Sequence, residues 1–442
     1  MSPHQTERTL ALSSRVTAGL ARLRGAESGV VCRWWVPGRI EVLGKHTDYA
    51  GGRSLLCATE RGICIAAAPR SDDRLHVLDA TTGETLDESM TQHAVAETQS
   101  PPGHWSNYVR TVALRVARNF APPLAGADVV LASDLPQAAG MSSSSALVIA
   151  MFLALSRVND LESRDEYRRA LPTREHLAEY VGTIENGQSF GELAGERGVG
   201  TFGGSEDHTA ILCARAGMLM QYAFCPVRLE RIAPVPAGHV FVVATSGVAA
   251  EKTGATRDRY NRLSTMITEI LRRWESVTGE RYVALGAAID ALASAEGDIR
   301  LMLRSARGAA GTDDRRQRFD HFLLESNELI PAATDALVAG NLGALGAIVD
   351  RSQDAAARLL GNQVPETQFL ARYARELGAV AASAFGAGFG GSVWALVPEA
   401  DASAFLTRWA DAYATRFPAA AARSEGFITR AGPGMLELGG DS

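Results

Sequence analysis

Three glycine- and serine-rich segments lie far apart in the chain, and each adjoins a run typical of a strand or a helix. They span Pro37 to Gly52, Leu135 to Ala146 and Ala384 to Gly391. Glycine lets a backbone approach an anion closely, and the free N–H groups at a helix N-terminus carry a partial positive charge. The serines of the second segment stand where an apolar helix-like run begins. The chain is therefore predicted to bind phosphate groups.

Two other phosphate-binding patterns fit the sequence poorly. A Walker loop requires G-x-x-x-x-G-K-[ST], but the Gly-Lys pair at positions 44–45 is followed by His46. The third segment does contain G-x-G-x-x-G. A dinucleotide fingerprint, however, follows a strand and opens a helix, whereas this segment precedes the strand-like run from Ser392 to Val397. A nicotinamide or flavin enzyme is therefore disfavoured.

The composition is that of a soluble metabolic enzyme. The chain has 442 residues, 46% of them hydrophobic, which is enough for two domains with sizeable cores. Its net charge of −6 argues against a nucleic-acid partner. Five cysteines without C-x-x-C spacing favour reduced thiols, and no signal peptide or membrane-spanning run is expected. We expect a cytoplasmic monomer or weak oligomer that contacts no membrane.

Strand and helix patterns mix in both halves of the chain, which predicts an α+β fold. We expect an N-terminal domain over residues 1–212 and a C-terminal domain over 213–442. The predicted strands are 30–36, 54–59, 63–68, 75–79, 129–132, 218–224, 240–244 and 392–397. The predicted helices are 107–119, 143–158, 174–184, 257–274, 317–329, 334–360 with a break near Gly340, 365–377 and 401–413.

In this order and spacing, the three segments resemble those of the GHMP small-molecule kinases. The first is similar to the signature of the galactokinase branch, typically G-R-[VI]-N-L-I-G-E-H-T-D-Y-N-G-G, and departs from it at Glu41, Lys45 and Ala50. The second resembles the phosphate loop P-x-x-x-G-L-S-S-S-A, and the third resembles S-x-x-T-G-A-G-F-G-G-C with Ser392 in place of Cys. This resemblance, over roughly residues 30 to 400, implies a two-domain GHMP kinase fold with the active site in the cleft between the domains.

The resemblance also implies an activity. We expect an ATP-dependent sugar 1-kinase that uses Mg²⁺ and transfers the γ-phosphoryl group to the anomeric hydroxyl of galactose or a related sugar or sugar acid. The sequence from His46 to Asp48 disfavours a mevalonate- or homoserine-type kinase. A non-catalytic sensor of sugar and ATP is the alternative. Retention of Arg39 and Asp207 favours catalysis, while the departures at Lys45 and in the insertion from Gly191 to Gly204 leave the sensor as an alternative.

By similarity, Asp207 is the catalytic carboxyl group that receives or orients the proton of the attacking hydroxyl, and Arg39 is the cation beside it. A helix N-cap is the structural alternative for Asp207. The residues expected to bind the sugar are Lys45, His46, Asp48, Gly204 and Tyr260.

The expected ATP contacts come from the second and third segments and from one tryptophan. They are Trp105, Gly140, Met141, Ser142, Ser143, Ser144, Ser145, Gly388 and Gly390. Ser143 or Ser144 is expected to reach the Mg²⁺, with Glu185 as the second ligand. Because a glycine-rich insertion from Gly191 to Gly204 separates Glu185 from Asp207, Glu192 and Glu196 remain alternative ligands.

Lysine is rare in this chain, since Lys45 and Lys252 are its two lysines among 44 basic residues. Galactokinases typically carry Glu where Lys45 stands. A lysine donates hydrogen bonds and cannot accept them. It therefore suggests an anionic sugar, such as a hexuronate, as substrate, although a simple pair between Lys45 and Glu41 is the alternative. The role of Lys252 stays open.

Overall fold

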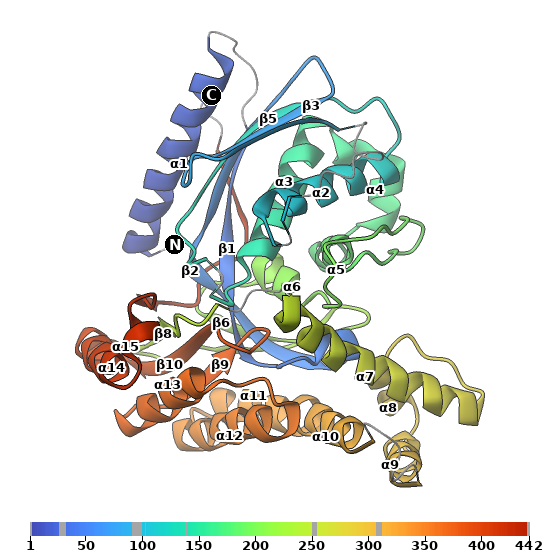
Figure 1. Cartoon of the computed structure of the whole chain (residues 1–442), viewed down its shortest axis with the longest axis vertical. Coiled ribbons are helices and arrows are strands. Elements are labelled where there is room, and N and C mark those ends of the chain that lie inside the picture. The colour runs from blue at the N-terminus through green and yellow to red at the C-terminus, as the bar shows by residue number, and fades with distance from the viewer. Residues whose placement is uncertain are drawn as a thin grey trace.

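Both halves of the described chain contain helices and strands in the computed structural model (Figure 1). The structure describes residues 2–25, 32–90, 100–101, 103–137, 139–249, 254–305 and 312–439. The strands are β1 (Cys32–Leu43), β2 (Arg53–Pro69), β3 (Arg74–Asp79), β4 (Thr85–Ser89), β5 (Ala127–Ser133), β6 (Met218–Ala223), β7 (Arg228–Pro234), β8 (His239–Thr245), β9 (Ala381–Phe385), β10 (Ser392–Pro398), β11 (Gly426–Thr429) and β12 (Leu436–Leu438). The longer helices are α1 (Pro3–Arg24), α2 (Trp105–Asn119), α3 (Ser143–Val158), α5 (Arg174–Asn186), α6 (Glu206–Cys213), α7 (Gly254–Thr278), α9 (Ala295–Ser305), α10 (Thr312–Leu323), α11 (Ile330–Val338), α12 (Leu342–Ala355), α13 (Pro365–Glu376) and α14 (Ala402–Arg416). Shorter helical pieces are η1 (Asp48–Ala50), η3 (Leu161–Ser163), α4 (Asp165–Ala170), α8 (Leu285–Ala291), η4 (Leu324–Leu329), η5 (Ala356–Leu360), η6 (Glu399–Asp401) and α15 (Pro418–Ala421).

A large sheet of eight strands is built around β2. Strands run in the order β12-β1-β2-β5-β3-β4, and all pairs are antiparallel except β3 with β5. The second half of β2 pairs with β5, while its first half, Arg53 to Leu56, pairs with β6, which in turn pairs with β7. The two predicted strands at 54–59 and 63–68 are therefore one continuous strand.

Helices cover both faces of this sheet (Figure 1). On one face, α1 packs Leu12, Val16 and Leu20 against Trp35 and its neighbours on β2 and β5. Gly19 allows this close approach, because a Cβ there would lie 2.8 Å from a methyl carbon of Val130. On the other face, α2, α3 and α5 enclose the main core. The apolar run of α3 fits this place, since all its residues from Ser145 to Ser156 are buried.

The second sheet has four antiparallel strands in the order β11-β8-β10-β9. Helices α13 and α14 pack on one face through residues such as Leu370 and Trp409. On the opposite face, Phe241 and Trp394 join the same core as Ile330 and the large sheet. This arrangement leaves one continuous core linking both sheets.

A third group of helices forms its own small core. Helices α7, α8, α9 and α10 pack together around Trp274, Phe319 and Phe322, and Ala50 of η1 reaches into this cluster. Because η1 belongs to the first glycine-rich segment, these helices help to fix the turn that follows β1.

The α+β prediction is confirmed, and most predicted elements exist close to their predicted bounds. The break near Gly340 is confirmed as the junction of α11 and α12. Strands β6 and β7 pair with the large sheet, so all strands before β8 belong to it. Strands β8 to β11 form the second sheet, and β12 joins the large sheet again. The division into domains at 212/213 stays a prediction. Among the described residues, the structure holds no helix long and apolar enough to cross a membrane.

Candidate active site

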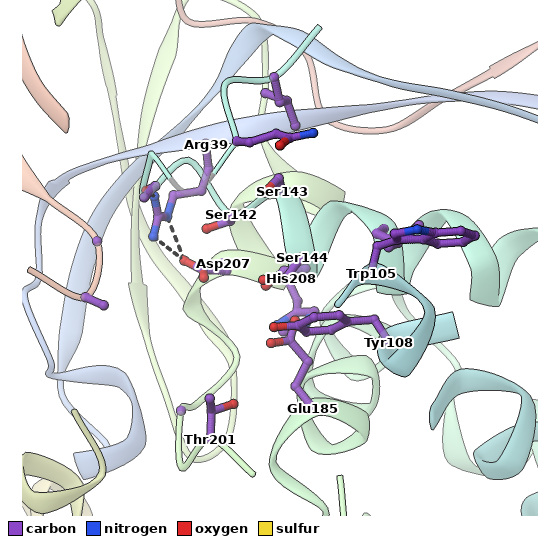
Figure 2. Close-up of a pocket in the computed structure, with 18 of the residues that line it drawn as sticks. Arg39, Trp105, Tyr108, Ser142, Ser143, Ser144, Glu185, Thr201, Asp207 and His208 are labelled. Carbon is purple, nitrogen blue, oxygen red and sulfur yellow. Dashed lines mark hydrogen bonds and ion pairs between the residues drawn. The ribbon is translucent and has the colours of Figure 1, made fainter. Parts of the chain in front are cut away.

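The three glycine-rich segments meet at one cavity of about 550 Å³. The first segment contributes the end of β1 and the following turn, the second the start of α3, and the third the connection from β9 to β10. Most of the site residues expected from the sequence line this cavity together (Figure 2). They are Arg39, His46, Asp48, Trp105, Gly140, Ser142, Ser143, Ser144, Ser145, Glu185, Gly204, Asp207 and Tyr260.

Arg39 and Asp207 form an ion pair in this cavity (Figure 2). Two guanidinium nitrogens of Arg39, Nε and one terminal nitrogen, each lie 2.6 Å from Asp207 Oδ1, and the other terminal nitrogen donates to the Gly140 carbonyl at 2.6 Å. Burial lowers the pKa of Arg39, but the charges of Asp207, Glu206 and Glu41 outweigh it and raise the pKa above its ordinary value. The N-cap of α6 is Ser205, so the alternative in which Asp207 is the cap is wrong.

The second segment turns sharply before α3 begins at Ser143. Gly140 and Ser142 both adopt left-handed backbone angles, with φ of 71° and 60°. The hydroxyls of Ser142 and Ser145 are buried and find no hydrogen-bond partner within the described part of the chain. Unpaired hydroxyls beside a helix N-terminus suit an anionic ligand such as a nucleotide phosphate.

Glu185, at the end of α5, faces the start of α3 across the cavity (Figure 2). Its Oε1 lies 3.0 Å from His208 Nε2, and Tyr108 bonds to Ser144 beside it. No group of three acidic, histidine or cysteine side chains forms a metal cage within the described ranges. Mg²⁺ usually takes one or two protein oxygens together with substrate phosphates and water, so a serine and Glu185 fit its needs. Glu192 and Glu196 lie outside the cavity lining.

The opposite end of the cavity carries four of the five expected sugar-binding residues, His46, Asp48, Gly204 and Tyr260. His46, at φ 59°, has Nδ1 2.9 Å from the Tyr49 hydroxyl and Nε2 3.0 Å from the Ala387 carbonyl. The Tyr260 ring lies 5.1 Å from the His46 ring. Gly204 permits close packing here, because a Cβ would lie 2.5 Å from Asp48 Oδ2. These contacts hold polar groups at fixed positions around a space suited to a small polyol.

Two further carboxyl groups line this end, Glu41 and Glu206, and sequence reasoning did not include them among the site residues. Glu206 accepts from the Ser54 hydroxyl at 2.7 Å. Burial raises the pKa of Glu41 to about 7 and that of Glu206 well above its usual value. The charges of Lys45 and Arg39 oppose the shift at Glu41, while Glu41 and Asp48 add to the shift at Glu206.

Four expected residues do not line the cavity. Lys45 is fully buried, and its Nζ donates to Ser352 at 3.3 Å. Gly388 and Gly390 pack instead against Asn362 and Val248, where a Cβ would meet carbonyl oxygens at 2.4 and 2.5 Å. The remaining one is Met141. Gly386 and Ala387 are the members of the third segment that reach the cavity. Lys252 lies outside the described residues.

Trp105 lines the other end of the cavity, where its indole N–H donates to Glu84, the residue before β4. Burial raises the pKa of the nearby Tyr108. The hairpin of β3 and β4 borders the same region through Asp79 and Thr82. In Figure 2, Trp105 and Tyr108 lie away from Arg39 and Asp207 and offer an aromatic surface.

The glycine-rich insertion after Gly191 is fastened to α7. The Asn261 amide donates to the Gly200 carbonyl at 2.9 Å and accepts from Phe202 N at 2.9 Å. This brings Thr201 and Gly203 into the cavity lining. The insertion therefore forms part of the wall instead of a remote loop.

Sequence reasoning missed several cavity residues. They include Glu41, Tyr49, Tyr108, Thr201, Gly203, Glu206, His208, Gly386 and Ala387. A signal existed for some of them, because Tyr49 lies in the first segment and Glu206 and His208 flank Asp207. Tyr108 and Thr201 enter through the packing of α2 and of the insertion, which the sequence pattern does not specify.

Comparison with known families matches three parts of the chain. The galactokinase galactose-binding signature matches residues 25–69, the GHMP kinases N-terminal domain matches 107–191, and the GHMP kinases C-terminal domain matches 333–415. The three matches include the β1 turn, the serine segment and the third glycine segment, which are the parts that meet at the cavity.

Several curated relatives are similar over most of the chain. A galactokinase of Roseiflexus sp. (strain RS-1) is 28% identical over 85% of this chain and 86% of its own length. A galactokinase of Actinobacillus pleuropneumoniae is 26% identical over 83% and 85%. In fold, the crystal structure of Lactococcus lactis galactokinase with galactose covers 96% of this chain and 98% of its own, with a TM-score of 0.76 at 22% identity. Mevalonate kinase of L. major in complex with R-mevalonate reaches a TM-score of 0.54 at 15% identity, covering 92% and 98%.

Proposed function

The chain belongs to the GHMP kinase superfamily, in its galactokinase-like branch, and on this premise we propose that it is an ATP-dependent sugar 1-kinase. It would transfer the γ-phosphoryl group of ATP to the anomeric hydroxyl of galactose or a closely related sugar. The observation that carries this proposal is the Arg39–Asp207 pair, which lies in one cavity between the serine segment and the sugar motif.

In the proposed reaction, the anomeric oxygen attacks the γ-phosphorus as the bond from that phosphorus to the β,γ-bridging oxygen breaks. The products are a sugar 1-phosphate and ADP, and Asp207 orients the hydroxyl and accepts its proton. Arg39 keeps Asp207 ionised and offsets the negative charge that develops on the transferred group. Because the transition state is loose, positioning and electrostatics supply most of the catalysis.

The nucleotide would lie along the start of α3. The N–H groups and hydroxyls from Gly140 to Ser145 would hold its phosphates, and the base would lie toward Trp105. Bound Mg²⁺ would be held by Ser143 or Ser144 and by Glu185, where it would neutralise charge on the phosphates.

A panel of sugars and sugar acids with ATP, followed by ADP release, tests the proposed activity. We expect turnover with galactose or a close relative of it. The relatives reported above are named as galactokinases, which favours a kinase over the non-catalytic sensor. Sugar and ATP binding without any ADP release would support the sensor instead.

Gly140→Val is expected to raise the Kd for MgATP by about tenfold. Valine is a genuine outlier at the φ of 71° that Gly140 adopts, so the turn that leads the chain into α3 would be distorted. The Kd of a non-hydrolysable ATP analogue, measured by calorimetry, checks this. Gly238→Val is the matched control, because Gly238 also has a positive φ and no atoms lie near its Cβ position. Equal nucleotide affinity in both variants would contradict the role of the loop.

Glu185→Gln is expected to raise the Mg²⁺ concentration needed for half-maximal activity by roughly 10- to 100-fold, since one anionic ligand is lost. Titrating Mg²⁺ at saturating ATP measures the shift. Glu192→Gln and Glu196→Gln serve as comparisons on the nearby insertion. A shift in one of these two variants, with none in Glu185→Gln, would transfer the metal role to the insertion.

A further inference from the structure

Arg318 of α10 is a buried cation that lies against the first-segment turn, which runs from Gly44 to Tyr49. The residue is 1% exposed, and its guanidinium carbon lies 5.7 Å from the centre of the Tyr49 ring. Its Nη2 donates to the His46 carbonyl and, at 3.1 Å, to the Tyr49 hydroxyl oxygen. Arg318 does not line the cavity. It can therefore affect the sugar end only through the residues that it holds.

The hydrogen bonds that lead from Arg318 to the cavity have one direction when the His46 ring is neutral. A carbonyl oxygen only accepts, so His46 Nε2, which lies 3.0 Å from the Ala387 carbonyl, carries the ring proton. His46 Nδ1 is then an acceptor, and the Tyr49 hydroxyl donates to it at 2.9 Å. Burial raises the pKa of Tyr49 to about 12, although the Arg318 charge opposes the shift, so the hydroxyl keeps this proton at neutral pH. Arg318 only donates, which fits its bond to the Tyr49 oxygen.

Both ring nitrogens of His46 are thus engaged by the protein itself. Through Ala387, which lines the cavity, the ring ties the first glycine-rich segment to the third. His46 also has a φ of 59°, a left-handed conformation that is costly for a residue other than glycine and persists only where the surroundings hold it. The contacts at its carbonyl and at its ring supply that hold. The expectation that the His46 ring binds a sugar hydroxyl therefore gives way to a supporting role.

The same stretch of α10 and η4 fixes the first-segment turn on both sides of Lys45. Before it, the Gly44 N–H donates to Glu325 Oε1 at 2.9 Å, and after it, the His46 carbonyl accepts from Arg318. The turn held in this way leaves the Lys45 side chain fully buried and outside the cavity lining. The expectation of an anionic sugar, which assumed that Lys45 faces the substrate, loses its basis.

We propose that Arg318 is a positioning residue of the sugar site, acting through Tyr49 and His46 to hold the first-segment turn against the third glycine-rich segment. The inference rests on the proposed sugar-kinase function. It predicts that Arg318 affects the binding of the sugar, because Asp48 in this turn lines the cavity, and has little effect on the binding of the nucleotide.

The first test is Arg318→Met, which keeps a long unbranched side chain and removes its charge and its donors. The galactose Kd, measured by calorimetry, is expected to rise by about 10- to 100-fold, because two hydrogen bonds to the turn are lost. The Kd of a non-hydrolysable ATP analogue should stay within about threefold of wild type, since the loop around Gly140 belongs to another segment.

The matched control is Arg115→Met on α2. Arg115 is also 1% exposed, donates to the Thr183 carbonyl at 2.6 Å and to the Ala194 carbonyl at 2.8 Å, and lies 6.0 Å from the centre of the Tyr180 ring. It lies outside the cavity lining and holds no part of the first-segment turn. This variant is expected to be less stable than wild type and to bind galactose with unchanged Kd.

A double-mutant cycle tests whether Arg318 acts through Tyr49. Tyr49→Phe keeps the ring and removes the hydroxyl that joins Arg318 to His46. If the three residues form one chain, the galactose Kd of the double variant should be close to that of Arg318→Met alone. Effects that multiply would show that the two residues act independently, which contradicts the inference.

Nitrogen-15 NMR of histidine-labelled protein reads the His46 ring directly, at a pH above the ordinary histidine pKa and with His46→Gln to assign the signals. Wild-type His46 is expected to carry its proton on Nε2 and to show a hydrogen-bonded Nδ1. Tyr49→Phe and Arg318→Met should move the Nδ1 resonance toward that of an unbonded nitrogen. Arg115→Met should leave it in place, so a general loss of stability is distinguished from the loss of this chain.

Some outcomes would overturn the inference. A wild-type His46 ring with its proton on Nδ1, or with two protons, contradicts it even if no variant folds. A galactose Kd in Arg318→Met within about twofold of wild type also contradicts it. The inference and the proposed function fail separately, because absence of ADP release with every sugar removes the kinase, whereas the His46 spectrum still reports whether Arg318 and Tyr49 hold the ring.

Discussion

Asp207→Asn is expected to lower kcat by about 10²-fold or more while MgATP and sugar still bind. The substitution keeps the size of the side chain and removes its charge, so the attacking hydroxyl loses the group that orients it and accepts its proton. Loss of a positioned general base typically costs 10²- to 10⁴-fold. Steady-state kinetics with galactose, together with the Kd of each substrate, separates this effect on catalysis from an effect on binding.

The matched control for this substitution is Asp128→Asn. Asp128 is a buried aspartate that, like the half-buried Asp207, pairs with an arginine, here Arg70, but it lies on β5 outside the cavity. The control is expected to lower stability and leave kcat unchanged. Turnover of Asp207→Asn close to wild type would remove Asp207 from the mechanism and direct attention to Glu206 or Asp48.

Arg39→Ala is expected to lower kcat by about 10²- to 10³-fold and to weaken nucleotide binding as well. Its guanidinium holds both the Asp207 carboxylate and the Gly140 carbonyl at 2.6 Å. Removing it takes the arginine away from the half-buried Asp207 carboxylate and frees the turn before α3. Kinetics and the MgATP Kd measure the two effects.

A lysine at position 39 tests whether charge alone is sufficient. Arg39→Lys keeps one positive charge but cannot reproduce the fork that bonds two partners at once. We expect it to recover only part of the lost kcat. Full activity in Arg39→Lys would show that the fork geometry is unnecessary, and full activity in Arg39→Ala would exclude a catalytic role for Arg39.

The sequence identified those parts of the site that depend on local backbone chemistry. Left-handed turns need glycine or small polar residues, and the serine segment stands directly before an apolar run, so the start of α3 could be placed at Ser143. Arg39 and Asp207 were found by family resemblance, and the structure places them in contact. In the structure, residues of all three glycine-rich segments line the same cavity.

Features that depend on packing between distant parts of the chain could not be predicted from local sequence patterns. Helix α1 escaped notice because its buried face includes Gln5, Thr9 and Gly19, which give no continuous apolar stripe. The orientation of Lys45 depends on the turn after β1, where Gly44 and His46 have positive φ. That turn directs Lys45 into the protein interior and His46 into the cavity, a distinction that neighbouring letters in a motif do not encode.

The pairing of β12 with β1 has a consequence for how the chain is made. Arg33 lies opposite Leu438 and Trp35 opposite Leu436, residues about 400 positions apart. During synthesis, this stretch of β1 has no neighbour on its outer side until about 400 further residues have been added. An unpaired strand edge is a template for pairing with other chains, and contacts between distant residues form slowly. The nascent protein therefore carries an open, aggregation-prone edge while these residues are made, and the edge is closed only when β12 has emerged.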